Sequence, residues 1–181
     1  MAAPAAFVVI RHLLTHPEDT PAKIAKHCFL HDTTVREAMK RLKNADILGH
    51  ERLLLQRLRN HPQRIRHRRY AFHAPNPDQF LSALDAPYWL SGEYAAALAG
   101  FDLVPEQAVV YVAAADLAAT TQAAKDVFAK IAPESKANVV VKVADSWLYL
   151  DPDSEIVERG QLLLDYQDSR HMQILKELDL A

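Results

Sequence analysis

Residues 20–53, TPAKIAKHCFLHDTTVREAMKRLKNADILGHERL, decide how the first part of the chain folds. Thr20 followed by Pro21 is an N-cap and first-turn pair, which predicts a helix through about Cys28. Phe29-Leu30-His31 then predicts a turn, and Asp32 is expected to cap a further helix. The apolar stripe of that further helix is Val35, Ala38, Met39 and Leu42. Two short helices joined by a tight turn are therefore expected.

The residues on either side extend this arrangement. The helical spacing of Phe7, Ile10 and Leu13 predicts an earlier helix to about Thr15. After Gly49, the runs Glu51–Leu58 and Arg64–Phe72 are interpreted as two strands of a hairpin, with loop chemistry between them. Three helices followed by a hairpin have the order of a winged helix-turn-helix. Residues 20–53 together with RIRHRRYAF at 64–72 resemble that bacterial transcription-factor pattern.

The resemblance implies that the helix after Asp32 enters the major groove of DNA. Its first turn presents Thr33, Thr34 and Arg36 to base edges or phosphates. Arg36 is expected to contact a guanine and Lys40 to meet the phosphate backbone, and Arg41 is a further predicted DNA-binding residue. The expected hairpin is rich in arginine and contains no acid between residues 52 and 69, which favours a polyanion partner. Its predicted DNA-binding residues are Arg57, Arg59, Arg64, Arg66 and Arg68.

Charge divides the chain into a basic and an acidic part. The 181 residues carry a net charge of −2. Residues 1–75 hold 14 Lys and Arg against 6 Asp and Glu, whereas residues 76–181 hold 7 against 17. We expect a DNA-binding domain over 1–75, a linker over 76–87 that contains Pro77 and Pro87, and an acidic domain over 88–181. A solvated basic face without a polyanion partner is the alternative interpretation.

Several classes of protein are disfavoured by composition. The single cysteine, Cys28, cannot form an internal disulfide, and it falls on an inward helical position as a small core residue. No apolar stretch approaches the length of a membrane span, and the first residues lack a signal-peptide pattern, so we expect a cytoplasmic protein without membrane partners. His12 and His16 stand four apart, and His27 and His31 flank the expected turn, but no Cys-rich spacing accompanies them. No metal and no cofactor are therefore expected.

Residues 88–181 predict a small α/β domain with a short sheet. The apolar runs Gln107–Ala113, Asn138–Val143 and Trp147–Leu150 are predicted strands. A helix capped by Ser91 closes at Gly100, and a longer one runs from Asp116 to about Ala132. Leu117, Thr121, Ala124, Phe128 and Ile131 form the inward stripe expected of the longer helix. Gln161–Tyr166 and Ser169–Leu178 are predicted as final helices. The fold class expected for the whole chain is a two-domain α+β or α/β protein.

A second resemblance lies in this acidic part. YWLSGEYAAALAGFDLVPEQAVVYV at 88–112, NVVV at 138–141 and GQLLLDYQDSRHMQILKEL at 160–178 resemble the C-terminal domain of AbiE-type abortive-infection antitoxins. The similar pieces are the Gly92–Ala96 helix start and the Leu163–Asp165 run, with Asp168 and Arg170 beyond. Members of that family join a winged helix to such a domain, repress their own promoter and counter a nucleotidyltransferase-like toxin. The resemblance implies type IV antitoxin function.

No catalytic set is recognised in the chain, so we expect no enzyme activity. Asp145, Asp151, Asp153 and Glu155 suggest a metal-dependent nuclease, but no D/E-x-K triplet follows Asp153. The sequence favours a DNA-binding transcriptional regulator, and a repressor in particular, that binds double-stranded DNA as a homodimer. Two alternatives stay open at this point: an antitoxin whose acidic domain binds a toxin, and an RNA-binding module.

Overall fold

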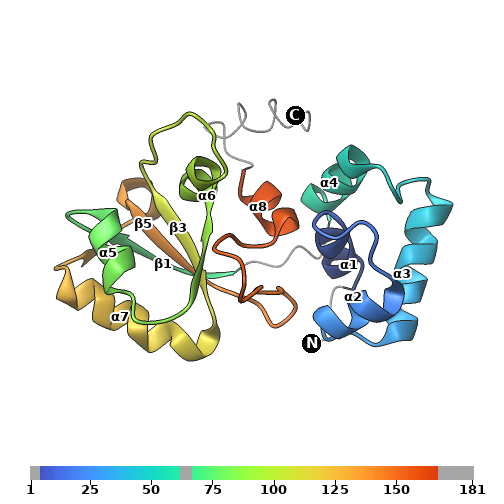
Figure 1. The fold of residues 1–181 in the computed structure, drawn as a ribbon, viewed down its shortest axis with the longest axis horizontal. Coiled ribbons are helices and arrows are strands. Elements are labelled where there is room, and N and C mark those ends of the chain that lie inside the picture. The colour runs from blue at the N-terminus through green and yellow to red at the C-terminus, as the bar shows by residue number, and fades with distance from the viewer. Residues whose placement is uncertain (1–4, 62–66, 167–181) are drawn as a thin grey trace. The chain divides into compact units, whose positions relative to one another are not determined.

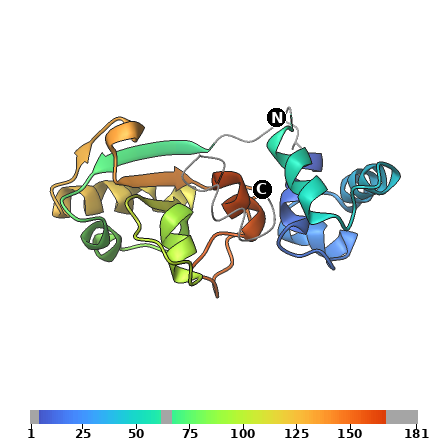
Figure 2. The same ribbon diagram turned by 90° about the horizontal axis from the view of Figure 1, so that it is seen from above.

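The computed structural model describes residues 5–61 and 67–166, which form two compact units (Figures 1 and 2). Residues 5–61, Ser146–Asp151 and 158–166 build the first unit. His67–Asp145 and Pro152–Val157 build the second unit. Helices and a mixed sheet together make this a mixed α/β protein. The two units differ from the expected domains, because the chain crosses between them more than once.

The first unit is helical and is centred on α1 (Ala5–Leu13), whose residues from Phe7 to Leu13 are all buried. α2 (Pro21–His27) and α3 (Asp32–Asn44) follow, as predicted from residues 20–53. The Thr20 hydroxyl accepts a hydrogen bond from the Lys23 amide at 3.4 Å, as an N-cap does. α2 contacts α3, and α1 contacts both α3 and α4. Val35, Ala38 and Leu42 bury the inner face of α3.

The prediction of a strand over Glu51–Leu58 was wrong. These residues form the helix α4 (Glu51–Arg59), which buries Leu54, Leu55 and Leu58. This spacing brings the three leucines to one helical face, and the segment contains no β-branched residue to favour a strand. A wing made of 51–58 and 64–72 is therefore absent from the described residues. Arg64 and Arg66 lie outside the described residues.

α8 (Arg159–Asp165) also belongs to the first unit, although the sequence placed it in the acidic domain. The helix predicted over Gln161–Tyr166 is confirmed, although it begins two residues earlier and ends one residue earlier than predicted. The helix predicted over Ser169–Leu178 falls outside the described residues. Arg11 Nε lies 2.9 Å from Glu158 Oε1, and both side chains are almost completely buried. A Cβ atom on Gly160 would lie only 2.0 Å from the carbonyl oxygen of Arg11. The start of α8 thus packs directly on the backbone of α1.

The second unit contains a sheet in the order β2-β3-β5-β1-β4. Its strands are β1 (Arg68–His73), β2 (Tyr88–Ser91), β3 (Ala108–Val112), β4 (Lys130–Ile131) and β5 (Val139–Val143). β3 and β5 are parallel, and β1 runs antiparallel to β5 and β4. The strand predicted over Arg64–Phe72 thus exists in part, but it pairs with β5 and not with residues 51–58. Five consecutive cross-strand pairs define the register of β1 on β5, from Arg68 opposite Val143 to Phe72 opposite Val139.

Three α-helices complete the second unit. They are α5 (Pro77–Ala83), α6 (Gly92–Leu98) and α7 (Leu117–Asp126), with the short 3-10 turns η1 (Ala114–Asp116) and η2 (Glu134–Lys136). α7 connects the parallel strands β3 and β5, which confirms the predicted strand-helix-strand unit. α5 contacts α7, and Phe80 is fully buried in the main core with Val110 and Val141. Residues 76–87 are therefore part of this unit and not a linker.

Two further predictions for residues 88–181 were wrong. α7 ends at Asp126 and not near Ala132, so Phe128 and Ile131 are exposed by 84% and 87% instead of facing inward. Phe128 adopts a φ of 56°, and the Ala129 amide bonds back to the Ala124 carbonyl, a Schellman arrangement that stops the helix. Trp147–Leu150 is not a strand. Instead, Ile156 forms an isolated bridge with Leu90 of β2.

We predict that the loss of either Arg11 or Glu158 alone destabilises the first unit more than the loss of both residues together. Arg11→Met or Glu158→Leu alone strands one buried charge, so each should lower the free energy of unfolding by about 3–5 kcal/mol. The double variant replaces both charges with apolar side chains and should cost less than either single variant. Urea unfolding followed by circular dichroism measures all three.

Arg41→Met is the matched control, because Arg41 pairs with Glu37 on the exposed surface of α3. Its loss should cost less than about 1 kcal/mol. A double variant as destabilised as the two single variants together would contradict the coupling.

Candidate nucleic-acid interface

The turn between α2 and α3 is built from residues 28–31. α2 ends in a Schellman arrangement, in which the Leu30 amide donates to the Ala25 carbonyl at 2.9 Å. Phe29 occupies the left-handed position of this arrangement with a φ of 53°. α3 then begins at Asp32 with His31 as its N-cap residue, one position earlier than predicted. The His31 ring bonds the Thr33 hydroxyl at 2.8 Å. The expected two short helices joined by a tight turn are therefore present, and the winged helix-turn-helix stays a prediction.

α3 presents a polar face to solvent within its unit. Figures 1 and 2 both show α3 and α8 on opposite sides of α1, so α8 does not cover this face. All of the α3 residues predicted to meet DNA are exposed, namely Thr33, Thr34, Arg36, Lys40 and Arg41. The structure therefore brings these five predicted site residues together on one helix.

Ion pairs on α3 neutralise some of its cations. Arg36 pairs with Asp32, and Arg41 pairs with Glu37, each at an i, i+4 spacing. Such exposed pairs are worth only a few tenths of a kcal/mol, so a phosphate or a base can replace the acid at small cost. Lys40 and Lys43 have no ion-pair partner among the described residues. α3 thus offers four cations, two of them without a competing carboxylate.

The other predicted site residues are dispersed. Arg57 and Arg59 lie near the end of α4, where Arg57 is exposed and Arg59 is half-buried. Arg68 belongs to β1 of the second unit, where its guanidinium donates to the Tyr70 hydroxyl at 3.4 Å. Among the described residues expected on a wing, Arg57 and Arg59 therefore lie on a helix of the first unit, and Arg68 lies on a strand of the second unit. The described arginines of 52–69 do not form one hairpin surface.

The separation of charge is weaker in the folded units than along the sequence. The described residues of the first unit contain 11 Lys and Arg against 9 Asp and Glu. Those of the second unit contain 6 against 11. Arg68 and Arg69 belong to the second unit, Arg64 and Arg66 lie outside the described residues, and the first unit gains three acids from residues 146–151 and 158–166. Attraction to a polyanion must therefore come from the local cations of α3 and α4, and not from a large charge on the unit.

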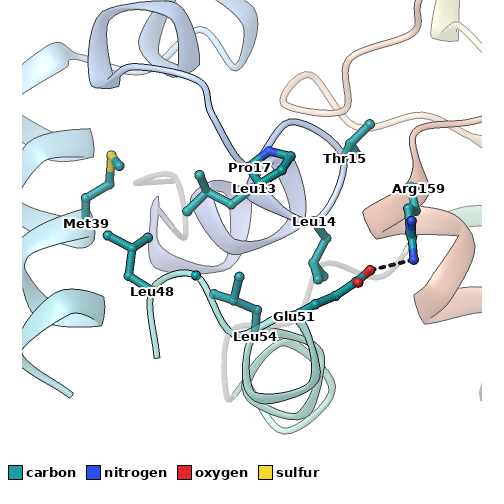
Figure 3. A pocket seen from close by; sticks show the side chains of 10 residues that line it. Leu13, Leu14, Thr15, Pro17, Met39, Leu48, Glu51, Leu54 and Arg159 are labelled. Carbon is teal, nitrogen blue, oxygen red and sulfur yellow. Dashed lines mark ion pairs between the residues drawn. The ribbon is translucent and has the colours of Figure 1, made fainter. Parts of the chain in front are cut away.

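A cavity of about 530 Å³ opens beside α1, α3 and α4 in the first unit (Figure 3). Its walls are mostly apolar, and the Glu51–Arg159 ion pair, at 2.6 Å, lies on one side. The apolar side chains that line it include Leu13, Leu14, Met39, Leu48 and Leu54. Because Glu51 neutralises Arg159, the cavity presents no net charge from this pair.

A cluster of histidines around Asp19 is the second polar feature of the first unit. His12 Nε2 lies 3.0 Å from Asp19 Oδ2, and His27 Nδ1 lies 3.7 Å from the same oxygen. Burial lowers the pKa of His12, and the hydrogen bond to Asp19 opposes that effect only in part. Burial alone would raise the pKa of the Asp19 carboxyl, but the bond from His12 and the neighbouring positive groups lower it overall. A neutral imidazole thus faces an ionised carboxylate near pH 7.

Sequence reasoning noticed His12, His16 and His27 but missed Asp19. Asp19 lies in the loop between α1 and α2, and its spacing from the histidines matches no metal motif. Only the folded loop brings its carboxylate between two imidazoles. Cys28, in contrast, is buried in the core as expected.

Comparisons of the chain with protein-family models, curated proteins and solved structures found no match. The resemblances to winged-helix regulators and to AbiE-type antitoxins therefore stay predictions. Among the helices of residues 5–61 and 67–166, none is long and apolar enough to cross a membrane.

Replacement of Phe29 by Asn should stabilise the first unit. The ring is 79% exposed, so little burial is lost, whereas the left-handed backbone is unfavourable for Phe and well tolerated by Asn. We expect a gain of about 0.5–1 kcal/mol in the free energy of unfolding, measured in urea. Phe128→Asn, at the equivalent position after α7, is the matched variant in the second unit. A loss of stability in Phe29→Asn would mean that its ring makes a contact worth more than the backbone strain.

Proposed function

We propose that the protein binds duplex DNA through the exposed face of α3 and acts as a transcriptional repressor. The observation that carries this proposal is the α2-turn-α3 unit with its five clustered polar and basic residues. An α-helix fits the major groove, and the outer face of α3 supplies the hydroxyls and cations that read bases and hold phosphates. α4 adds the exposed cations Arg52 and Arg57 in the same unit.

Each α3 residue has a role in this proposal. Arg36 exchanges Asp32 for a guanine edge, where its planar guanidinium makes two hydrogen bonds. Thr33 and Thr34 lie in the first turn, which enters a groove first. Lys40 and Lys43 meet phosphates as point charges. Since one helix contacts only a few base pairs, the protein binds as a homodimer on two half-sites.

A selection experiment tests the function directly. The purified full chain is mixed with a random duplex library, and bound fragments are sequenced after several rounds. We expect enrichment of a short two-fold symmetric motif, and a light-scattering mass of two chains per selected duplex. Duplex RNA of the same length is the competitor in a parallel titration. Absence of an enriched motif, or equal competition by RNA, would contradict sequence-specific DNA binding.

Arg36→Ala should reduce specificity more than affinity for random DNA. We expect a loss of about 1–3 kcal/mol on the selected sequence and little change on random duplex, because a base contact is lost. Fluorescence anisotropy with labelled duplexes measures both. Lys125→Ala, which removes an exposed cation from α7 of the second unit, is the control and should change neither value. Equal losses on both duplexes would show that Arg36 does not read sequence.

Binding should weaken steeply with salt. If each α3 and its neighbouring cations meet about four phosphates, log K should fall against log salt with a slope of about −4 for each chain. Lys40→Ala removes one phosphate contact and should reduce the slope by about one unit. Anisotropy titrations at four salt concentrations give these slopes. A binding constant that does not change with salt would contradict the electrostatic account of α3.

A further inference from the structure

The imidazoles of His12 and His27 face the Asp19 carboxylate, and the His16 ring lies beside the His12 ring in the first unit. His12 lies on α1, His27 ends α2, and His16 and Asp19 lie between them. His12, Asp19 and His27 each offer a ligand atom, and these atoms all lie within 4.8 Å of one another. The rings of His12 and His16 are 4.8 Å apart, centroid to centroid. The backbone bond from the His16 amide to the His12 carbonyl, at 2.9 Å, keeps these two rings on one side.

These distances are close to those of a metal site. Ligands bound to zinc at about 2.0–2.2 Å in a tetrahedron lie about 3.3 Å from one another. The distances from Asp19 Oδ2 to His12 Nε2 and to His27 Nδ1 are 3.0 and 3.7 Å, one below and one above that value. Small side-chain rotations would bring all three ligand atoms to one centre. Nitrogen and oxygen donors of this kind are those that zinc prefers besides thiolates.

The burial of the cluster is difficult to explain by hydrogen bonds alone. His12 is fully buried, and His27 Nδ1, which faces Asp19 Oδ2, has no hydrogen-bond partner among the described residues. The Asp19 carboxylate is 15% exposed, and its Oδ2 faces two imidazoles that can donate only one proton each when neutral. Three imidazoles so close together would repel one another if they were protonated. A divalent cation at the centre of the cluster would accept the nitrogen lone pairs and also neutralise the Asp19 carboxylate.

Two neighbours hold the cluster in shape. The Tyr149 ring stacks on His27 with centroids 4.9 Å apart and planes inclined by 17°. Lys23 Nζ lies 3.5 Å from the other Asp19 oxygen, Oδ1, which leaves Oδ2 directed at the histidines. Both contacts orient a ligand without occupying the centre. Metal ligands are commonly held by such outer contacts, which fix ring and carboxylate orientation.

We propose that His12, Asp19 and His27 form a zinc-binding site, with His16 placed to provide the fourth ligand. The site ties the end of α1 and the following loop to the last turn of α2. Zinc is chosen over magnesium or calcium because imidazoles outnumber carboxylates. The described residues offer at most four ligands here, so a bound ion stabilises the helical unit and performs no reaction in this proposal. The inference does not rest on DNA binding.

Zinc binding to the untagged, metal-free full chain tests the proposal. Titration against a chromophoric chelator gives the stoichiometry and affinity, and thermal unfolding gives a second measure, because a ligand of the folded state raises the Tm. We expect one zinc ion per chain and a higher Tm with zinc than with magnesium. Failure to bind zinc, or a Tm that zinc does not raise, would overturn the proposal.

Variants locate the ion. Asp19→Asn and His27→Gln affect partly exposed residues and keep their approximate shape, and each should weaken zinc binding at least about tenfold. His50→Gln is the matched control, because His50 is an exposed histidine of the same unit outside the cluster. Its affinity for zinc should equal that of the unmodified chain. Circular dichroism of the metal-free variants checks that each is folded.

Cobalt substitution provides a readout that does not depend on stability. Co²⁺ bound by nitrogen and oxygen ligands in a tetrahedron gives intense visible bands, whereas six-coordinate cobalt gives weak ones. We expect the intense bands in the unmodified chain and in His50→Gln, and their loss in His27→Gln. Unchanged bands and unchanged zinc affinity in both cluster variants would place the ion elsewhere and overturn the proposal.

Discussion

The buried ion pair of Arg11 and Glu158 holds the helical unit together. A charge taken out of water is costly, and it is tolerated here because each side chain meets its opposite at 2.9 Å and Arg11 also approaches Gln161. The glycine at 160 allows the backbones of α8 and α1 to touch beside this pair, and the Gly160 amide donates to the Thr15 hydroxyl. α1 is therefore covered on the side of α8 as well as by α3 and α4. This explains why α1 is buried over nearly its whole length instead of on one face.

Helix endings without glycine are a second constraint on this chain, which has only four glycines. α2, α3 and α7 all end with a residue other than glycine in the left-handed conformation, namely Phe29, Asp46 and Phe128. In each case the next amide bonds back into the last turn of the helix. Two of these residues are phenylalanines with exposed rings. These sharp turns therefore carry backbone strain at residues other than glycine. The turn after α2 determines where α3 begins.

The proposed functions use separate parts of the helical unit. The face of α3 that would meet DNA consists of exposed hydroxyls and cations, whereas the histidine cluster lies between α1 and α2 and is largely enclosed. α2 joins them, since His27 is its last residue and the turn to α3 begins at Cys28. An ion that fixes the end of α2 would therefore also restrict the turn from which α3 starts. The apolar cavity beside α1, α3 and α4 touches neither the outer face of α3 nor Asp19.

Features that depend on neighbouring residues could be predicted from the sequence. Thr20-Pro21 and the apolar spacing predicted α2, the turn and α3, because caps and helical periodicity act within a few residues. The uninterrupted apolar run before Ala113 predicted β3 for the same reason. The exposed residues of α3 could likewise be named from the sequence, because a helix has one inner stripe and the remainder faces outward.

The tertiary structure alone decided the features that join distant residues. The leucine spacing of 51–59 is compatible with a helix, and packing on α1 selects the face that carries Leu54, Leu55 and Leu58. Arg68–His73 has strand character, but only the fold selects β5 as its partner. Arg11 and Gln161 lie 150 positions apart, and Asp19 meets two histidines through a folded loop. Burial stabilises any complementary pair of residues that the chain can bring together, whatever their separation in the sequence. The residues next to each partner therefore do not indicate which distant residue it will contact.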